Sequence, residues 1–527
     1  MMETRQHDLL LLDDVVQRTV VNPTASHGWH QMIDILRRKS TPALAQQLEQ
    51  FLLLNIASDG LPGFYRASFL DMLTGKPEYL QQAGQIVLGL QPFDPDRVIT
   101  FLQNSWQRVL LDASGRQVFQ QRLMAIGLPK IAHAISLWSQ QNLLQTTALH
   151  VRKISQIKRL ALIAPALINI KHPPTLMALQ QAECLRRCGY EVVLYSAQEM
   201  LGPDFQHYLG SNAYESNPQF STAGWERYLG VGGQLMTGDS RFSLTQRFKS
   251  LLNHMAGFDP DLVMSVGLYS GLAATVHPLR PILSLGINSL SPMVPADVWL
   301  TAQREFDQFI ASPWDSVFPL SQGHYHPYRL VPPVMTKKHS RTDLGWPDDG
   351  VVMITLLSDS NARIKGEWAA HMVDVLTRNP QLSWIIVGGN GDMPAALHGV
   401  TQGQVKTIPF CIDAVNYLPV CDIYVNPPMM GGGFAVAEAM ALGLPVLSFS
   451  GSDGGDKLGT AALASTDAYF ARLDAWICNR TLRQQAGQAM QQHFVSVLDL
   501  AQSSPSLQAA CELAVQRFHL RAAASIS

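Results

Sequence analysis

The chain has 527 residues, a formal net charge of −2, 47% hydrophobic residues and only 15% charged residues. This length exceeds what one hydrophobic core organises, so we expect two or three domains with large buried sheets. The near-neutral balance argues against a nucleic-acid partner. No run of the sequence reaches the roughly 18–20 apolar residues of a transmembrane helix.

The first residues and the cysteines indicate the compartment. Four leucines at 9–12 are followed at once by two aspartates, a pattern too short and too acidic for a signal peptide. The six cysteines form no CxxC pair, and Cys184 and Cys188 lie at helical spacing, which favours core or free thiols over a metal site. We therefore expect a reduced, cytoplasmic protein without a bound metal.

Residues 1–150 carry Leu, Ile, Val and Ala at three- and four-residue steps, in stretches such as 41–57, 77–90, 94–112 and 118–144. This spacing predicts an all-α amino-terminal domain. No catalytic group of residues stands out in it. Docking of a partner or acceptor and a purely structural cap are both compatible with the pattern.

Residues 151–325 alternate apolar runs with an amphipathic helix, which predicts a Rossmann-like domain with a parallel sheet. The predicted strands lie at 159–168, 190–197, 258–267 and 280–289. His172 follows the first of them. Loops at the carboxyl ends of parallel strands face the ligand crevice, so His172 is a candidate to contact an acceptor. A solvated loop histidine is the alternative.

Residues 326–480 form a second domain of the same type, and we interpret the aromatic, proline-rich segment 321–335 as the connection to it. Arg363 and Lys365 follow its first strand, where fixed cations can meet a pyrophosphate. Ordinary surface cations are the alternative. Residues 481–527 read as helices that could return to the first α/β domain.

The stretch 421–459 reads as strand, glycine loop, helix and strand. The loop contains Gly431, Gly432 and Gly433, and the helix is predicted to begin at about Phe434. A helix N-terminus offers unpaired N–H groups and a partial positive charge to a diphosphate, and glycines let the anion approach the backbone. Glu438 could then accept hydrogen bonds from ribose hydroxyls. The alternative is a glycine-rich turn that only packs.

The block 438–446, EAMALGLPV, is similar to the signature of the GT-B glycosyltransferases of the retaining group that includes glycogen and sucrose synthases. In that family an acidic pair separated by seven residues brackets the glycine loop. The resemblance makes Glu438 the ribose ligand. The earlier acidic position is occupied by Met430, which leaves both retention of configuration and the donor sugar open.

A second resemblance begins with Cys421-Asp422 and continues through Asn426-Pro427, the glycine loop and the acidic residue at 438. It resembles the cytoplasmic adhesin-modifying N-glycosyltransferases, which also place a helical domain before two Rossmann-like halves. The resemblance implies that Lys365 contacts the diphosphate, that Asn426 belongs to the donor site, and that Pro409 and Phe410 lie where the base is contacted. The acceptor segment of that family is not found, since 285–297 reads LGINSLSPMVPAD.

Together these patterns predict an α/β protein of the GT-B fold, with an all-α leader and two Rossmann-like domains facing a cleft. We expect a metal-independent hexosyltransferase without a cofactor, using a nucleotide sugar, UDP-linked by preference, as co-substrate. The acceptor is a protein, a polysaccharide or a lipid-linked glycan. A nucleotide-sugar epimerase and a non-catalytic binding protein stay open. A Rossmann dehydrogenase is disfavoured because no GxGxxG opens the turn at 166–175.

Overall fold

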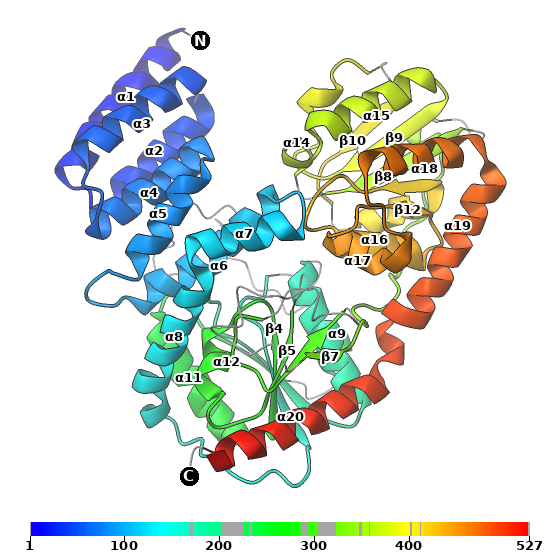
Figure 1. The fold of residues 1–527 in the computed structure, drawn as a ribbon. Helices are drawn as coiled ribbons and strands as arrows, with labels where there is room; N and C mark the ends of the chain where they lie inside the picture. Colours follow the sequence, from blue (N-terminus) through cyan, green and yellow to red (C-terminus); the bar gives the residue numbers. More distant parts are fainter. Residues whose placement is uncertain are drawn as a thin grey trace.

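The computed structural model describes residues 2–39, 41–168, 172–201, 226–230, 234–286, 292–302, 323–346, 350–357, 359–400, 403–411 and 413–524. Figure 1 shows an amino-terminal group of helices, a first sheet with its helices, and a second sheet that lies beside helix α7. The chain begins at the far end of the helical group and ends beside the first sheet.

The amino-terminal region is entirely helical where it is described, which confirms the predicted all-α leader. Proline occupies the first turn of α3, α5 and α6, and the side chains of Thr41 and Asp94 cap α3 and α6, so local capping chemistry sets these helix starts. The helices are α1 (Met2–Val21), α2 (Ser26–Lys39), α3 (Pro42–Asn55), α4 (Gly60–Thr74), α5 (Pro77–Val87), α6 (Pro95–Asp112), α7 (Arg116–Ile126) and α8 (Leu128–Leu143).

The first sheet is parallel, with the strand order β3-β2-β1-β4-β5-β6-β7. Its strands are β1 (Arg159–Ile163), β2 (Glu191–Ser196), β3 (Gln234–Thr237), β4 (Leu262–Val266), β5 (Ile282–Leu285), β6 (Val298–Thr301) and β7 (Gly323–Tyr325). Its helices are α9 (Pro173–Arg187), α10 (Glu226–Leu229), α11 (Leu244–Phe258) and α12 (Gly271–Val276). The prediction missed β3, β6 and β7, because strands of three or four residues give too little pattern to read. As a result, residues 323–325 of the segment 321–335 form an edge strand, and the connection follows them.

The second sheet is also parallel, with the order β10-β9-β8-β11-β12. Its strands are β8 (Val351–Leu356), β9 (Leu382–Val387), β10 (Val405–Ile408), β11 (Ile423–Val425) and β12 (Val446–Leu447), and its helices are α14 (Ser360–Arg363), α15 (Gly366–Arg378), α16 (Gly433–Ala441) and α17 (Asp453–Leu458). The chain winds one way through β8, β9 and β10 and the other way through β11 and β12. The exits of β8 and β11 therefore flank a topological switch point, where open α/β sheets bind ligands. Two Rossmann-like sheets behind a helical leader confirm the predicted fold class.

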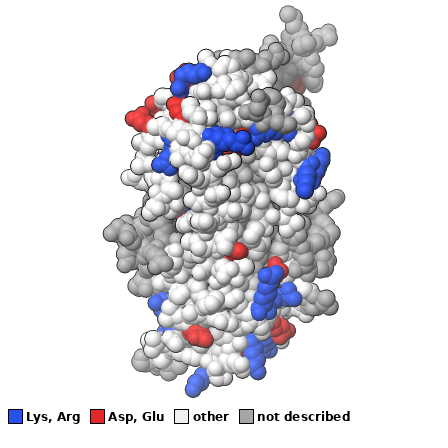
Figure 2. All heavy atoms as spheres, turned by 90° about the vertical axis from the view of Figure 1, so that its right-hand side faces the viewer, with Lys and Arg blue, Asp and Glu red and all other residues white. Residues whose placement is uncertain are grey.

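The carboxyl-terminal helices run from the second sheet back to the first: α18 (Thr466–Cys478), α19 (Arg480–His493) and α20 (Ser504–Ala524), the last packed on β5 and β6. Figure 2 shows this side of the molecule, where charged residues gather toward the ends and leave a broad uncharged middle. Helix α19 lies on this side, and many of its exposed residues are uncharged glutamines, at 484, 485, 488, 491 and 492. Within the described ranges, no helix combines the length and apolarity that a membrane crossing requires.

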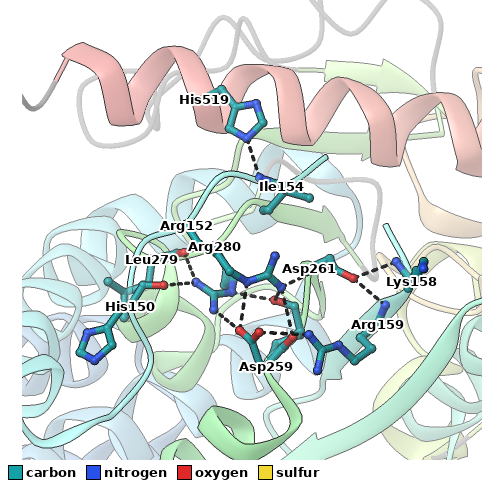
Figure 3. Close-up of polar contacts among 11 residues, drawn as sticks. His150, Arg152, Ile154, Lys158, Arg159, Asp259, Asp261, Leu279, Arg280 and His519 are labelled. Atoms are coloured by element: carbon teal, nitrogen blue, oxygen red, sulfur yellow. Dashed lines mark hydrogen bonds and ion pairs between the residues drawn. The ribbon is translucent and has the colours of Figure 1, made fainter. Parts of the chain in front are cut away.

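A polar network fixes the segment that leads from the helical region into the first sheet, at the amino ends of β1 and β4 (Figure 3). The carboxylate of Asp259 accepts hydrogen bonds from Arg152 (3.1 Å) and Arg159 (3.0 Å), and also from the fully buried Arg280. Asp261 accepts from the backbone N–H groups of residues 158 and 159, both at 2.8 Å. This network lies at the edge of the sheet opposite to the predicted ligand edge.

At the carboxyl edge of the first sheet, the helical region closes over a buried carboxyl group. Glu199, fully buried after β2, accepts hydrogen bonds from Gln103 of α6 (3.0 Å), from the Ser270 hydroxyl (2.7 Å) and from the Gly271 N–H (3.0 Å). Burial raises the pKa of Glu199 in spite of these bonds. The first turn of α12 is thus satisfied from inside the protein.

Candidate active site

The glycine loop joins β11 to α16 and has a geometry that only glycine accommodates. Gly432 adopts φ +91° as the residue preceding α16, and a Cβ there would lie 2.4 Å from Met429 Cε. Helix α16 begins at Gly433, one residue before the predicted start, within the usual uncertainty of helix ends. Gly432 has no side chain with which to cap the helix. The first N–H groups of α16 therefore suit an anionic ligand.

Asn426 packs against this loop from the interior of the protein. Its side chain is fully buried, its Nδ2 donates to Ser448 Oγ (2.9 Å), and its backbone carbonyl accepts from the Tyr469 hydroxyl (3.1 Å). A Cβ on Gly454 would lie 2.8 Å from the same Nδ2. The protein thus holds Asn426 through its Nδ2 and its carbonyl, while its buried Oδ1 has no hydrogen-bond partner among the described residues, and its place in the donor site stays a prediction.

The sequence reasoning missed Asp453, which packs directly against the start of α16. A Cβ on Gly433 would lie 2.1 Å from Asp453 Oδ2, and the Asp453 N–H donates to the carbonyl of Met430 (2.8 Å). Lys457 neutralises this carboxylate at 2.9 Å, and both side chains are buried. The signal in the sequence was an acidic residue beside Gly454 and Gly455. Nothing near it in the sequence indicates that its side chain packs against the glycine loop at 431–433.

Glu438 lies partly buried on α16 and faces the second sheet. Its charge adds to the effect of burial in raising the pKa of Tyr424, a residue of β11. The Tyr424 hydroxyl in turn donates to the carbonyl of Leu356 at the end of β8 (3.4 Å). Glu438 is therefore on the side of α16 that approaches the exit of β8, from which Arg363 and Lys365 also follow.

The two predicted cations have different surroundings. Arg363 is 8% exposed and donates to the carbonyl of Leu110 in α6 (3.2 Å), and burial lowers its pKa to about 10, so it stays protonated near neutral pH. The side chain of Lys365 is 63% exposed, and its Nζ lies 3.7 Å from Asp112 Oδ1 of the helical region. Lys365 is accessible to a ligand, whereas Arg363 is bound to the helical region.

Pro409 and Phe410 follow β10 at the same edge of the sheet. The Phe410 N–H donates to the carbonyl of Gly389, which follows β9 (2.9 Å). The Phe410 side chain is 63% exposed, although large aromatic side chains are usually buried. A Cβ on Gly391 would lie 2.8 Å from Pro409, so these two strand exits are tightly packed. An exposed aromatic ring at this place could stack against a flat heterocycle.

His172 belongs to the other half of the molecule. It immediately precedes α9 at the carboxyl edge of the first sheet, and its Nδ1 lies 3.0 Å from Thr175 Oγ1. Burial lowers the pKa of His172 to about 4, so the ring is neutral at physiological pH. Phe434, at the start of α16, packs against the core cluster that contains Met177 of α9, which brings the glycine-loop helix to this half.

Taken together, one edge of the second sheet carries most of the predicted residues: Arg363, Lys365, Pro409, Phe410, Asn426, Gly431, Gly432, Gly433, Phe434 and Glu438. His172 lies on the first half. Among the described residues, no group of three or more His, Cys, Asp or Glu side chains could hold a metal ion. An exposed ammonium, an uncapped helix start and a partly buried carboxylate suit a ligand that combines a diphosphate with hydroxyl groups.

Known proteins resemble this chain over part of its sequence and in its fold. Residues 354–471 match the family model for glycosyl transferases group 1. An O-GlcNAc transferase mutant from Thermobaculum terrenum aligns over 98% of this chain and 99% of its own, at 13% identity and a TM-score of 0.53. Two partial likenesses are glycosyltransferase SnogD from Streptomyces nogalater (16% identity, 67% and 99% covered, TM-score 0.38) and a putative UDP-N-acetylglucosamine 2-epimerase from Listeria monocytogenes (14%, 63% and 91%, TM-score 0.39). No curated protein matches the chain.

Proposed function

We propose that the chain is a GT-B glycosyltransferase of the group 1 type that transfers a hexose-class sugar from a UDP-linked donor to a protein acceptor, without a catalytic divalent metal. The O-GlcNAc transferase named among the structural neighbours aligns with nearly the whole chain, helical region included. That coverage supports a hexose-class sugar. A helical region of this size supports a large acceptor, for which a protein is the simplest choice.

One observation carries the donor side of the proposal. The exposed Lys365 and the glycine loop follow β8 and β11, the two strands that flank the switch point of the second sheet. A diphosphate bound there would lie between an ammonium group and the first N–H groups of α16. Phe410, two strands away beyond β9, is suitably placed to stack on the base, and Glu438 to accept hydrogen bonds from the ribose.

The chemistry follows from these positions. Transfer breaks the bond between the anomeric carbon and the diphosphate oxygen, so negative charge grows on the leaving diphosphate. Lys365 and the N–H groups of Gly433 and Phe434 would stabilise this charge because they are already oriented before the reaction. Their fixed charge makes a bridging metal unnecessary in this mechanism. The acceptor atom forms the new bond to the anomeric carbon, and its proton passes to a base on the side of the first sheet.

His172 is the residue we assign to that acceptor side. Its imidazole enters the reaction neutral, because burial holds its pKa at about 4, and a neutral ring nitrogen can accept a hydrogen bond from an acceptor group. Met430 occupies the place of the earlier acidic residue of the retaining families and is fully buried. No carboxylate is therefore offered to the sugar at that position.

The test is a thermal-shift panel with UDP-, GDP-, dTDP- and CMP-sugars, followed by product analysis with and without acceptors. A ligand that binds only the folded state raises the melting temperature, and we expect the UDP-sugars to do so. Sugar transfer to protein, but not to glycans or lipid-linked acceptors, would support the full proposal. A changed sugar on donor alone would indicate an epimerase, and binding without turnover over a broad acceptor screen would indicate a non-catalytic protein.

A further inference from the structure

The corner between α6 and α7, residues 110–116, contacts the loops that form the predicted donor site. The carbonyl of Leu110 accepts a hydrogen bond from Arg363, which follows β8 (3.2 Å). The carbonyl of Ala113 accepts one from the N–H of Met430, directly before the glycine loop (2.9 Å). The helical region is thus in contact with both strand exits that flank the switch point.

Arg116, the first residue of α7, extends this contact to α17. Its backbone N–H donates to the carbonyl of Gly451 (2.7 Å), and its guanidinium forms an ion pair with Asp456. Both side chains are 5% exposed. Burying two opposite charges costs solvation, so such a pair adds little net stability but is sensitive to the loss of either partner. The main consequence of the ion pair is that it fixes the orientation of α7 relative to α17.

Helix α17 in turn contacts the glycine loop. Asp453, three residues before Asp456, donates its N–H to the carbonyl of Met430 (2.8 Å), and its carboxylate packs on Gly433. There is no free space for a Cβ at Gly433, so a movement of α17 would displace the first residue of α16. A chain of contacts therefore runs from Arg116 through α17 to the N–H groups assigned to the diphosphate.

We propose that Arg116 is a positioning residue for the donor diphosphate, supplied by the helical region to a site that lies in the second α/β half. Arg116 bonds to Asp456 and to the carbonyl of Gly451, and these bonds fix the position of α17. Helix α17 in turn fixes the start of α16. Its own side chain is too buried to reach a ligand, so it acts through the loop. This inference rests on the proposed function, because it assumes that a nucleotide diphosphate binds at the glycine loop.

The experiment compares Arg116→Gln, Arg116→Lys, Asp456→Asn and the double variant Arg116→Gln/Asp456→Asn. UDP, GDP, dTDP and CMP are first screened on the wild type, and the nucleotide that binds is titrated by calorimetry well below every melting temperature. We expect Arg116→Gln and Asp456→Asn each to raise Kd about tenfold, and Arg116→Lys to recover most of the loss. The double variant should lose less than the product of the single effects, because both substitutions break the same pair.

Arg97→Gln is the matched control. Arg97 forms an ion pair with Asp94 at 2.7 Å and donates to the Tyr65 hydroxyl at 3.5 Å, and both partners belong to the helical region. Its substitution should lower the melting temperature without changing Kd. If Arg116→Gln does not fold, Arg116→Lys and Asp456→Asn carry the same comparison.

Kd values within about twofold of the wild type in the folded Arg116 and Asp456 variants would overturn the positioning role, whatever happens to their melting temperatures. Failure of the wild type to bind any nucleotide is a separate result. It would overturn the proposed function, because no variant is involved in it.

Discussion

In the first α/β half, α12 begins at Gly271 with its first N–H groups bonded to Glu199; in the second, α16 begins at Gly433 after a residue that has no side chain. Both helices follow a central strand of a parallel sheet, β4 and β11. One helix start is satisfied by a buried carboxyl group of the protein itself. The other is preceded by glycines and has no side-chain cap bond.

The difference between the two helix starts indicates which half we expect to bind an anion. A helix start already bonded to an internal carboxyl group has little left to offer a diphosphate, whereas the start of α16 has no side-chain cap bond, and the Asp453 carboxylate packed against its first residue is neutralised by Lys457. The helical region contributes to both situations: Gln103 of α6 helps to bury Glu199, and the corner at 110–116 fixes the loops around α16. The four predictions below test this contrast.

The largest effect is expected from Lys365→Ala combined with Glu438→Ala, which removes the accessible cation and the ribose carboxylate of the second half. Losing one preorganised charge in an active site typically costs about 10²–10³ in rate, so turnover should fall below detection while the fold is kept. Circular dichroism and a donor-turnover assay measure the two properties. Lys249→Ala, on the exposed face of α11, is the control. Full activity in the double variant would rule out the site.

Gly433→Ala should weaken donor binding strongly. Its Cβ would lie 2.1 Å from the buried Asp453 carboxylate, so α17 or the start of α16 has to move. A clash of this kind costs about 1–3 kcal/mol of folding stability and displaces the N–H groups that we assign to the diphosphate. Denaturant unfolding and nucleotide titration measure both effects. Gly399→Ala, whose Cβ would meet no atom within 4 Å, is the control and should behave as wild type.

Asp112→Asn should strengthen nucleotide binding by a few-fold. Asp112 Oδ1 lies 3.7 Å from Lys365 Nζ, and the pair is about half exposed, so the attraction is modest and is screened by salt. The substitution frees Lys365 and removes a negative charge from the neighbourhood of the diphosphate. Calorimetry at low and high salt measures the gain, which should shrink at high salt. A weaker affinity in this variant would show that Asp112 helps to form the site.

The smallest effect concerns His172 and the dependence of stability on pH. Burial lowers its folded-state pKa from 6.5 to about 4, so the unfolded chain binds more protons between these values. Stability should therefore fall as the pH drops from about 6.5 to about 4, and His172→Asn should reduce that slope. Some slope will remain, because burial, helped by Arg521, lowers the pKa of His277 in the same direction. Urea unfolding at pH 7, 5.5 and 4.5 checks this, and an unchanged slope would contradict the lowered pKa of His172.

Local patterns were sufficient to predict the two parallel α/β sheets and the glycine loop, whereas the GT-B fold followed from the resemblance to a known family. The runs at 351–356 and 382–387 are continuous and apolar, and three glycines before a helix are a strong local signal. Contacts between distant segments were not predictable. Arg116 and Asp456 are 340 residues apart, and nothing near either one indicates the other. For the same reason, the hydrogen bond from the Arg363 guanidinium to a carbonyl of α6 was not predictable, and the role of Arg363 at the donor site stays a prediction.

Hydrogen exchange of the peptide covering residues 429–436 tests the central claim most directly. The first N–H groups of α16 have no partner within their own helix, so they should exchange fast in the free protein. We predict that UDP slows exchange in this peptide and that Lys365→Ala abolishes the protection, with no comparable change at the start of α12. Nucleotide binding that leaves residues 429–436 unprotected would contradict the account, because the diphosphate would then lie elsewhere.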